Sequence, residues 1–536
     1  MRIENIDHLG LVAGIIDELG LEDLTDKEIA PHSLEHVSTG QVVKAMILNA
    51  MGFLSAPLYL FSEFFESKAV SHLLGAGVEA KHLNDDRLGR GLDALYAVGI
   101  TPFFLKVALQ AVERFGIDIQ QRHLDSTSIS VPGEYPSEAS SEASEPISIT
   151  LTRGYSRDHR PDLKQFLMTL ACSADGGVPL WLQVASGNAS DSQQFATVMT
   201  SFQQNWTSEG VFVMDAAFYS APNLKAVGNL GWISRVPQTL SAAKALIQGE
   251  TAHLNELECE QADYRLWEMP QDYGGVAQRW ILVECQSRQG DGQRAEATLA
   301  KQEKILHRQL KALSQQTFAS KAEAIEAVMA FQDTLTLHHL AQVRVAPPVP
   351  KRGRKRTSPT HASSSGAGYC IEAQLERSEN ALEQVKRQQS RFILATNQLD
   401  TALWPADKVL SEYKNQQKVE RGFRFLKDPL FFASSVFVKK PQRVEALALV
   451  MALTLLVYTL AERKLRQALA VQQQTVLNQR KRPTAKPTFR WIMQAFQGIH
   501  WVWIQGQWQI SNLNDQRRLI IQLLGPPIER YYYALS

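Results

Sequence analysis

The 536-residue chain has few cysteines and almost no excess charge. Cys172, Cys259, Cys285 and Cys370 lie far apart and form no CxxC pair, which argues against a zinc site and against the disulfide scaffold of a secreted protein. The 56 Lys and Arg residues are balanced by 55 Asp and Glu residues. Any contact with nucleic acid must therefore come from local basic patches, because the chain has no overall basic field.

Long hydrophobic runs are also scarce. A strongly apolar uncharged run, ALALVMALTLLVYTLA at 446–461, is slightly short for a membrane span and contains two Thr and one Tyr. We expect it to form a buried helix, with membrane association as the alternative. The N-terminal MRIENIDHLG lacks the basic-then-apolar pattern of a secretion signal. The sequence therefore predicts a cytoplasmic protein with no membrane partner.

The spacing of apolar residues changes along the first half of the chain. Residues 1–116 carry apolar side chains at helical spacing, which predicts a helical N-terminal domain. Residues 117–235 contain β-branched, alternating stretches, a hairpin around Gly176-Gly177, a helix near 191–205 and the short apolar strand VFVM, so they predict the first part of an α/β core with a mixed sheet.

The second half of the chain divides into three predicted regions. Residues 236–390 contain a hairpin and two amphipathic helices, and we interpret them as an α+β insertion domain. It includes a basic, Pro- and Ser-rich linker near 347–368 that is typical of disordered segments. Residues 391–469 resume the core with a strand and further helices. Residues 470–536 form a C-terminal region that mixes basic and aromatic side chains.

Three carboxylates are distinguished by their positions. Asp125 lies within the first predicted core strand, Asp215 ends the short apolar strand, and Glu420 lies on the helix that follows the last strand. Ligands of α/β folds bind at the carboxyl ends of strands. Three carboxylates held by rigid elements suit one or two Mg²⁺ ions, which prefer oxygen ligands. On spacing alone, this choice among 55 acidic residues is weak.

The segment SEYKNQQKVERGFRFLKDPL, at 411–430, carries four polar side chains at regular intervals. Tyr413, Gln416, Glu420 and Lys427 are separated by three, four and seven residues, steps that keep side chains on one side of a helix. The pattern predicts a single helix that presents all four within an arc of about 60°.

These residues resemble a known signature. Tyr413, Gln416, Glu420 and Lys427 match the spacing Y-(2)-R-(3)-E-(6)-K of a group of DDE transposases of bacterial insertion sequences, the IS-four superfamily, with Gln at the Arg position. HLDSTSISVPGEY and FVMDAAFYS resemble the segments around the first and second Asp of that family. HLNDDRLGRGLDALY resembles the helical N-terminal domain of one subgroup.

The resemblance implies a fold, a reaction and partners. The expected core is ribonuclease-H-like, with an insertion domain between its last two strands. In it, Asp125, Asp215 and Glu420 would hold two Mg²⁺ ions, with Mn²⁺ as the alternative, for in-line displacement at phosphorus. The expected partners are the terminal inverted repeats of the element, the target DNA and a second copy of the chain in a homodimer on DNA.

The same resemblance implies DNA contacts. Tyr413 and Lys427 would hold phosphates, whereas Gln416 can donate a hydrogen bond but supplies no charge. Arg235, in WISRVP, matches a basic position after the second Asp; an ion pair at the end of a strand is the alternative.

Three further regions are candidates for binding DNA. The helical N-terminal domain is expected to read the DNA ends. The run QRKRPTAKPTFRW at 479–491 is a candidate for contact with the DNA backbone. For KRGRKR at 351–356 we favour a solvated linker over a DNA contact.

Three other functions compete with that of an active transposase. One is a nuclease of the same fold that hydrolyses nucleic acid without strand transfer. Another is a DNA-binding regulator descended from a transposase, which performs no chemistry and has no need of the three carboxylates. The third is a helical interaction scaffold, which distant and singly solvated carboxylates would support.

Overall fold

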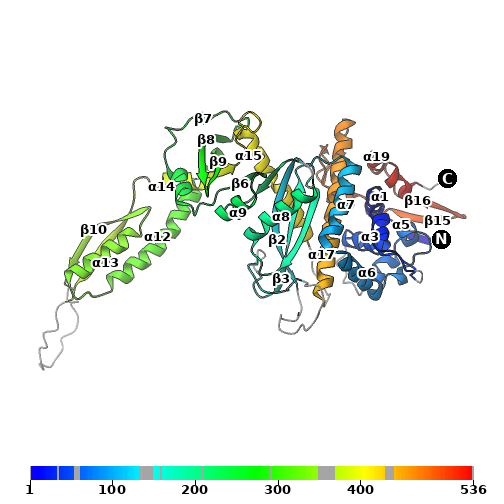
Figure 1. Cartoon of the computed structure of the whole chain (residues 1–536), viewed down its shortest axis with the longest axis horizontal. Coiled ribbons are helices and arrows are strands. Elements are labelled where there is room, and N and C mark those ends of the chain that lie inside the picture. Colours follow the sequence, from blue (N-terminus) through cyan, green and yellow to red (C-terminus); the bar gives the residue numbers. More distant parts are fainter. Residues whose placement is uncertain are drawn as a thin grey trace, which may run out of the picture.

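A nine-stranded mixed sheet runs through the middle of the protein (Figure 1), in the order β4-β3-β2-β5-β6-β12-β9-β8-β7. This computed structural model describes the residues that follow. They are 2–32, 35–53, 61–131, 135, 149–156, 160–206, 209–289, 292–347, 368–428 and 440–533.

The first part of the sheet is built around β2 (Gln121–Val131). β3 (Lys164–Ser173) pairs with it in antiparallel fashion, and β4 (Pro179–Ser186) pairs with β3. On its other side, β5 (Val211–Met214) runs parallel to β2, and β6 (Gly231–Arg235) runs parallel to β5. β2, β5 and β6 therefore run in the same direction, and β2 continues beyond the ends of the other two strands.

The second part of the sheet comes from two distant stretches of the chain. β12 (Arg391–Thr396) lies antiparallel to both β6 and β9 (Val276–Cys285), and β9 forms a hairpin with β8 (Tyr264–Tyr273), which β7 (Glu256–Leu257) continues. This hairpin was assigned to the insertion domain, yet it extends the core sheet. The WILV stretch of β9 is buried on both faces, and its side chains pack in the two hydrophobic clusters on opposite faces of the sheet.

Glycine pairs form the turns of both predicted hairpins. Gly176 and Gly177 join β3 to β4, and Gly274 and Gly275 join β8 to β9. All four have positive φ, between 67° and 92°, a conformation that costs glycine little.

The separate part of the insertion region is an arm that projects from the sheet (Figure 1). It consists of α12 (Gly292–Ser314), α13 (Lys321–Asp333) and the two-stranded sheet of β10 (His338–Ala346) and β11 (Cys370–Arg377). α14 (Ala381–Ser390) leads back to β12. Most of the predicted basic linker, with KRGRKR, lies outside the described residues.

The described part of residues 1–116 is helical apart from β1 (Arg2–Asn5). The side chain of Asn84 caps one of these helices by accepting a hydrogen bond from the backbone N–H of Arg87 at 2.9 Å, as its position before an apolar helical pattern predicts. The helices are α1 (Leu9–Leu19), α2 (Leu21–Glu28), α3 (Thr39–Ala50), α4 (Phe61–Glu66), α5 (Val70–Leu74), η2 (Ala80–His82), α6 (Asp85–Val98) and α7 (Ile100–Phe115).

The predicted apolar helix is α17 (Pro441–Val471), and it connects the sheet with the N-terminal helices. It is long and apolar enough to cross a membrane, but 89% of its most apolar stretch is buried inside the protein. It packs against β4 and against α1, α3, α6 and α7. The expectation of a buried core helix is therefore met.

The C-terminal region folds back onto the N-terminal helices, and both ends of the chain lie at the same end of the molecule (Figure 1). β15 (His500–Ile504) pairs with β1 and with β16 (Gln507–Ile510). α19 (Asp515–Leu524) packs on α17, and α20 (Pro526–Tyr532) packs on α1. Two regions that we predicted as separate thus share one hydrophobic core.

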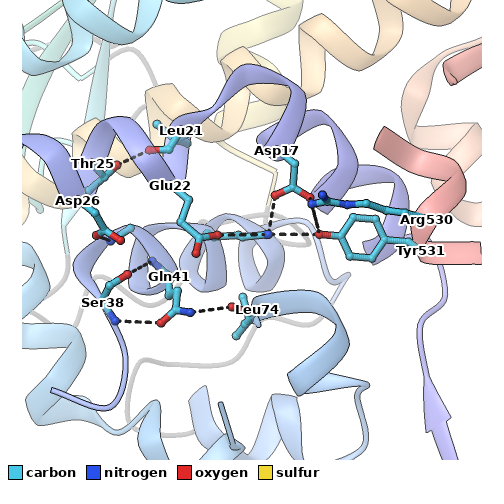
Figure 2. Close-up of polar contacts among 12 residues, drawn as sticks. Asp17, Leu21, Glu22, Thr25, Asp26, Ser38, Gln41, Leu74, Arg530 and Tyr531 are labelled. Atoms are coloured by element: carbon cyan, nitrogen blue, oxygen red, sulfur yellow. Dashed lines mark hydrogen bonds and ion pairs between the residues drawn. The ribbon is translucent and has the colours of Figure 1, made fainter. Parts of the chain in front are cut away.

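A buried ionic cluster ties α20 to the N-terminal helices (Figure 2). The buried Lys44 ammonium lies 2.6 Å from Asp17, 3.4 Å from Glu22 and 3.3 Å from the Tyr531 hydroxyl, and Arg530 also pairs with Asp17. Burial alone lowers the pKa of Lys44, but the attraction of these anionic and phenolic groups outweighs it and raises the pKa. The cluster therefore holds Lys44 charged.

Candidate active site

Asp125, within β2, lies side by side with Asp215, which directly follows the carboxyl end of the adjacent strand β5. The parallel register pairs His123 of β2 with Val213 of β5. Continued by two residues, the same register sets Asp125 opposite Asp215. Aligned residues on neighbouring strands point to the same face of a sheet, so the two carboxylates share a face.

Arg235, on the next strand β6, is in line with the two aspartates across the sheet. Met214 of β5 pairs with Ser234 of β6, so Asp215 is followed across the sheet by Arg235. The guanidinium lies 5.3 Å from the centre of the Phe392 ring. Within the described residues it makes no ion pair with a carboxylate, so the alternative of an ion pair at the end of a strand is not what the structure shows.

Backbone hydrogen bonds orient both aspartates. Asp125 is 8% exposed, and its Oδ1 accepts a hydrogen bond from the N–H of Ser126 at 2.7 Å. Asp215 follows β5 directly, and its Oδ1 accepts from the N–H of Ala217 at 2.9 Å, a turn that Asp side chains commonly stabilise. The position of each carboxylate is thus set by the strand that carries it.

The single helix predicted over residues 411–430 is in fact two helices. α15 (Ala406–Asn415) and α16 (Gln417–Leu426) meet at Gln416. The backbone N–H of Gln416 bonds to the carbonyl of Tyr413 at 3.1 Å, a step of three residues that tightens the backbone into a 3₁₀-like turn. The four signature residues therefore do not lie along one continuous helix, although Gln416 itself keeps right-handed helical angles, with φ of −54° and ψ of −27°.

Three of the signature residues nevertheless line one small pocket, together with Arg235. Tyr413 comes from α15, Gln416 from the junction and Glu420 from α16; the pocket volume is about 270 Å³. Gln416 is 7% exposed, whereas Glu420 is exposed. Lys427 follows the last residue of α16 and does not line this pocket.

Besides burial, the pKa of Tyr413 depends both on Glu420 of the pocket and on Asp215, which is aligned with Asp125. Burial raises this pKa most, and the negative charges of Asp215 and Glu420 raise it further. The charge and hydrogen bond of Arg235 oppose them. Tyr413 therefore stays protonated at neutral pH and can donate a hydrogen bond.

The pocket also contains cationic and aromatic residues that the sequence did not predict: Tyr264, Arg288, Phe392 and Lys414. The Lys414 ammonium lies 4.3 Å from the centre of the Tyr264 ring and 2.6 Å from the side-chain oxygen of Gln261. Tyr264 is the first residue of β8, and Arg288 lies in α11 (Gln286–Gln289), which follows β9. Because the β8–β9 hairpin looks like part of a separate domain in the sequence, Tyr264 and Arg288 were not expected at this site. Lys414 directly follows the signature residue Tyr413, and this position was the signal that could have identified it.

The predicted metal ligands Asp125, Asp215 and Glu420 partly fit the requirements of a divalent cation. Asp125 and Asp215 offer carboxylate oxygens side by side, the ligand type that Mg²⁺ and Mn²⁺ prefer. Glu420 lies on α16, which packs against β2. Within the described part of the chain, no three His, Cys, Asp or Glu residues lie close enough together to hold a metal ion. The structure thus brings two of the three predicted ligands together, with the third on the covering helix.

Comparisons with known proteins identify the family. Residues 118–457 match the family model described as "Transposase DDE domain", and residues 1–109 match a domain of unknown function, DUF4277. No curated protein matches the sequence. The cryo-EM structure of a piggyBac transposase synaptic complex with hairpin DNA aligns with a TM-score of 0.38 at 9% identity, over 100% of this chain and 85% of that chain. A TM-score this low carries no weight.

The family match decides the identity. It extends over more than half of the chain and includes Asp125, Asp215 and Glu420. Members of this family generally use divalent metal ions. The protein belongs to the DDE transposases and is a DNA transposase.

Proposed function

We propose that this transposase cuts the terminal inverted repeats of its own insertion sequence and joins the 3′-hydroxyls to target DNA. Asp125, Asp215 and Glu420 are its catalytic carboxylates in this proposal. The observation that supports it most is the alignment of Asp125 with Asp215 on adjacent parallel strands, on one face of the sheet. We assign the enzyme to the IS-four group, with a ribonuclease-H-like core and Gln416 at the signature Arg position.

The cofactor in this proposal is a pair of Mg²⁺ ions, which Mn²⁺ can replace. When bound, they activate the attacking hydroxyl or water and stabilise the leaving oxygen. Asp125 and Asp215 supply oxygen ligands that the strands and the N–H groups of Ser126 and Ala217 hold in position. Glu420 is exposed on α16, and we expect its side chain to turn toward the aspartates when DNA binds.

Four further side chains hold the phosphates of the reacting strand. Arg235 has no carboxylate partner within the described residues, so its charge is available to a phosphate. Tyr413 donates from its protonated phenol, and Gln416 donates from its amide without adding charge. Lys427, at the C-terminal end of α16, contacts the DNA strand as a point charge.

The enzyme acts as a homodimer on DNA in the cytoplasm, since two ends of one element must be brought together before joining. Identical subunits related by a two-fold axis present identical surfaces to two inverted repeats. The helical N-terminal region also contributes to recognition of the ends in this proposal.

The test uses a labelled duplex that carries the terminal repeat of the element, incubated with Mg²⁺ and a target plasmid. We expect Asp215→Asn to reduce cleavage by at least about 100-fold, the effect of losing a main electrostatic stabiliser of the transition state. Glu326→Gln, at an exposed position on α13, is the control and should cleave normally.

The products separate the proposal from its alternatives. Joined products support strand transfer, whereas hydrolysed ends without joining indicate a nuclease. Binding without any metal-dependent cleavage indicates a regulator. Normal cleavage by Asp215→Asn would overturn the assignment of the catalytic carboxylates.

A further inference from the structure

The two regions that share a core at one end of the molecule carry opposite charges. Residues 1–116 contain nine Lys and Arg and sixteen Asp and Glu, whereas residues 471–533 contain eight Lys and Arg and only two Asp and Glu. DNA is a dense polyanion, and its affinity for a protein depends mainly on cations that neutralise its phosphates. The charge distribution therefore favours the C-terminal region as a DNA-contact surface.

Ion pairs already engage most of the cations of the N-terminal helices. Their partners are carboxylates of the same region, so these side chains contribute little net positive field. The pairs are Lys44 with Asp17 at 2.6 Å, Lys68 with Asp7 at 3.0 Å, Lys81 with Glu79 at 2.6 Å, Arg87 with Glu35 at 3.2 Å and Lys106 with Glu28 at 2.6 Å.

The cations of the C-terminal region include three consecutive residues at the tip of a small hairpin. Its strands are β13 (Val476–Leu477) and β14 (Pro483–Thr484). Arg480, Lys481 and Arg482 lie between these strands and are exposed. In the part of the chain that the structure describes, no carboxylate forms an ion pair with any of the three side chains.

Hydrogen bonds fix the shape of this tip. The side-chain oxygen of Asn478 accepts from the backbone N–H of Arg480 at 2.9 Å and from that of Arg482 at 3.1 Å. The N–H of Asn478 donates to the carbonyl of Arg482 at 2.9 Å. Lys481 adopts a left-handed conformation, with φ of 56°. Because the tip is already ordered, binding loses less backbone entropy there.

The stem of the hairpin is anchored to the helices behind it. The N–H of Leu477 donates to the side-chain oxygen of Gln516 in α19 at 3.0 Å. The carbonyl of Leu477 accepts from the indole N–H of Trp491 at 2.8 Å, and Trp491 lies in α18 (Phe489–Ala495). The three cations are thus presented by a rigid support.

We propose that the β13–β14 hairpin binds the phosphate backbone of duplex DNA, as a contact surface outside the active site. This inference rests on the proposed function for the presence of DNA. It differs from the expectation that the helical N-terminal region makes the main contact outside the catalytic core. Side chains that neutralise phosphates carry no sequence information, so the hairpin holds any duplex, including DNA that flanks the reacting ends.

The test measures binding of the full chain to a fluorescent duplex of unrelated sequence, as a function of KCl concentration. Each neutralised phosphate contributes about 0.9 to the slope of log K against log salt. R480Q/K481Q/R482Q should therefore lower the slope by about 2 to 3 and weaken binding at least about tenfold at low salt. The control K301Q/K304Q/K321Q removes the same charge from exposed residues of α12 and α13 that form no ion pair in the described part of the chain, and it should keep the wild-type slope.

The outcomes separate this inference from the proposed function. A wild-type slope in the hairpin variant, with unchanged thermal unfolding, overturns the hairpin as a DNA-contact surface. An equal loss in the control variant also overturns it, because overall charge would then explain the effect. Asp215→Asn should bind the duplex with the wild-type slope and fail to cleave; cleavage by that variant would contradict the proposed function and leave the hairpin inference standing.

Discussion

Asp125 and Asp215 stand at the same level of β2 and β5, on the face of the sheet that α15 and α16 cover. Val211 and Val213, on the same face of β5, pack in one hydrophobic cluster with Val409 and Leu410 of α15. The helix pair is therefore held on the carboxylate side of the sheet by apolar contacts, and this places the pocket of Tyr413 and Glu420 next to the aspartates.

Mg²⁺ should stabilise the folded protein through the paired aspartates. A ligand that binds only the folded state at 100 times its dissociation constant adds about 2.7 kcal/mol to the free energy of unfolding. We expect a Mg²⁺-dependent rise in the melting temperature of the wild type and of the Glu326→Gln control, and a much smaller rise for D125N/D215N. An equal rise in all three proteins would show that the ion binds elsewhere.

Gln416→Arg should strengthen the contact with DNA. The side chain lines the pocket of Arg235 and Tyr413, and an arginine there restores the charge of the signature. The slope of log K against log salt should become steeper by about 0.9, the contribution of one further phosphate. Gln316→Arg, at an exposed position after α12, is the control. If both variants change the slope equally, the position of Gln416 has no special role.

Lys44→Met should destabilise the protein strongly. The substitution leaves the partly buried Glu22 without its cation and Asp17 with only the Arg530 cation. Breaking a buried pair costs about 3 to 5 kcal/mol, and the remaining Arg530 places the expected loss near the lower value. Urea unfolding followed by circular dichroism measures the loss. The control is Lys106→Met, which removes the half-exposed partner of Glu28 and should cost less than about 1 kcal/mol. Equal losses would mean that the buried cluster does not hold the two ends of the chain together.

His8 should make the protein less stable in acid. Its Nε2 donates to the carbonyl of Met51 at 2.7 Å, and its Nδ1 lies 2.6 Å from the side-chain nitrogen of Gln497. Burial lowers the pKa of His8 from 6.5 to about 4; the hydrogen bond to Met51 and the charge of Asp7 oppose this shift, and Lys68 adds to it. The folded protein therefore holds His8 neutral between these two pH values.

The sign of the pH effect follows from proton uptake. Between pH 6.5 and 4 the unfolded chain protonates His8 and the folded protein does not, so the free energy of unfolding falls as pH falls, by about 3 kcal/mol across this window. Denaturant titrations from pH 8 to pH 4 should show a smaller fall for His8→Gln than for the wild type. His253→Gln, at an exposed position, should retain the wild-type fall. Parallel curves for His8→Gln and the wild type would refute the assignment.

Local patterns in the sequence predicted many of the elements correctly. The hairpin turns at Gly176 and Gly274 follow from residues that tolerate positive φ. The burial of α17 follows from a helix that is apolar on every side. Asn84 caps α6 because a short polar side chain precedes an apolar helical pattern. In each case the cause lies within a few residues of the effect.

Contacts between segments that are far apart in the sequence caused the differences between the predicted and the observed structure. The β8–β9 hairpin looks self-contained in the sequence, and only its hydrogen bonds to β12 show that it belongs to the core sheet. No proline or glycine lies at the helix break at Gln416, so the local sequence does not predict the break. It occurs where α15 packs on the sheet beside β5 and β6 while α16 contacts β2 and α17, so tertiary contacts override a continuous helical pattern.

The sequence by itself determined the identities and order of the candidate catalytic residues, the buried apolar helix and the basic run at the C-terminus. Only the tertiary structure decided which of these residues meet. Asp125 and Asp215 become neighbours through a strand register, and Glu420 and Lys427 are carried to opposite ends of α16 relative to the pocket. Both ends of the chain close around α17, because an apolar helix of this length is covered only when several distant segments pack on it.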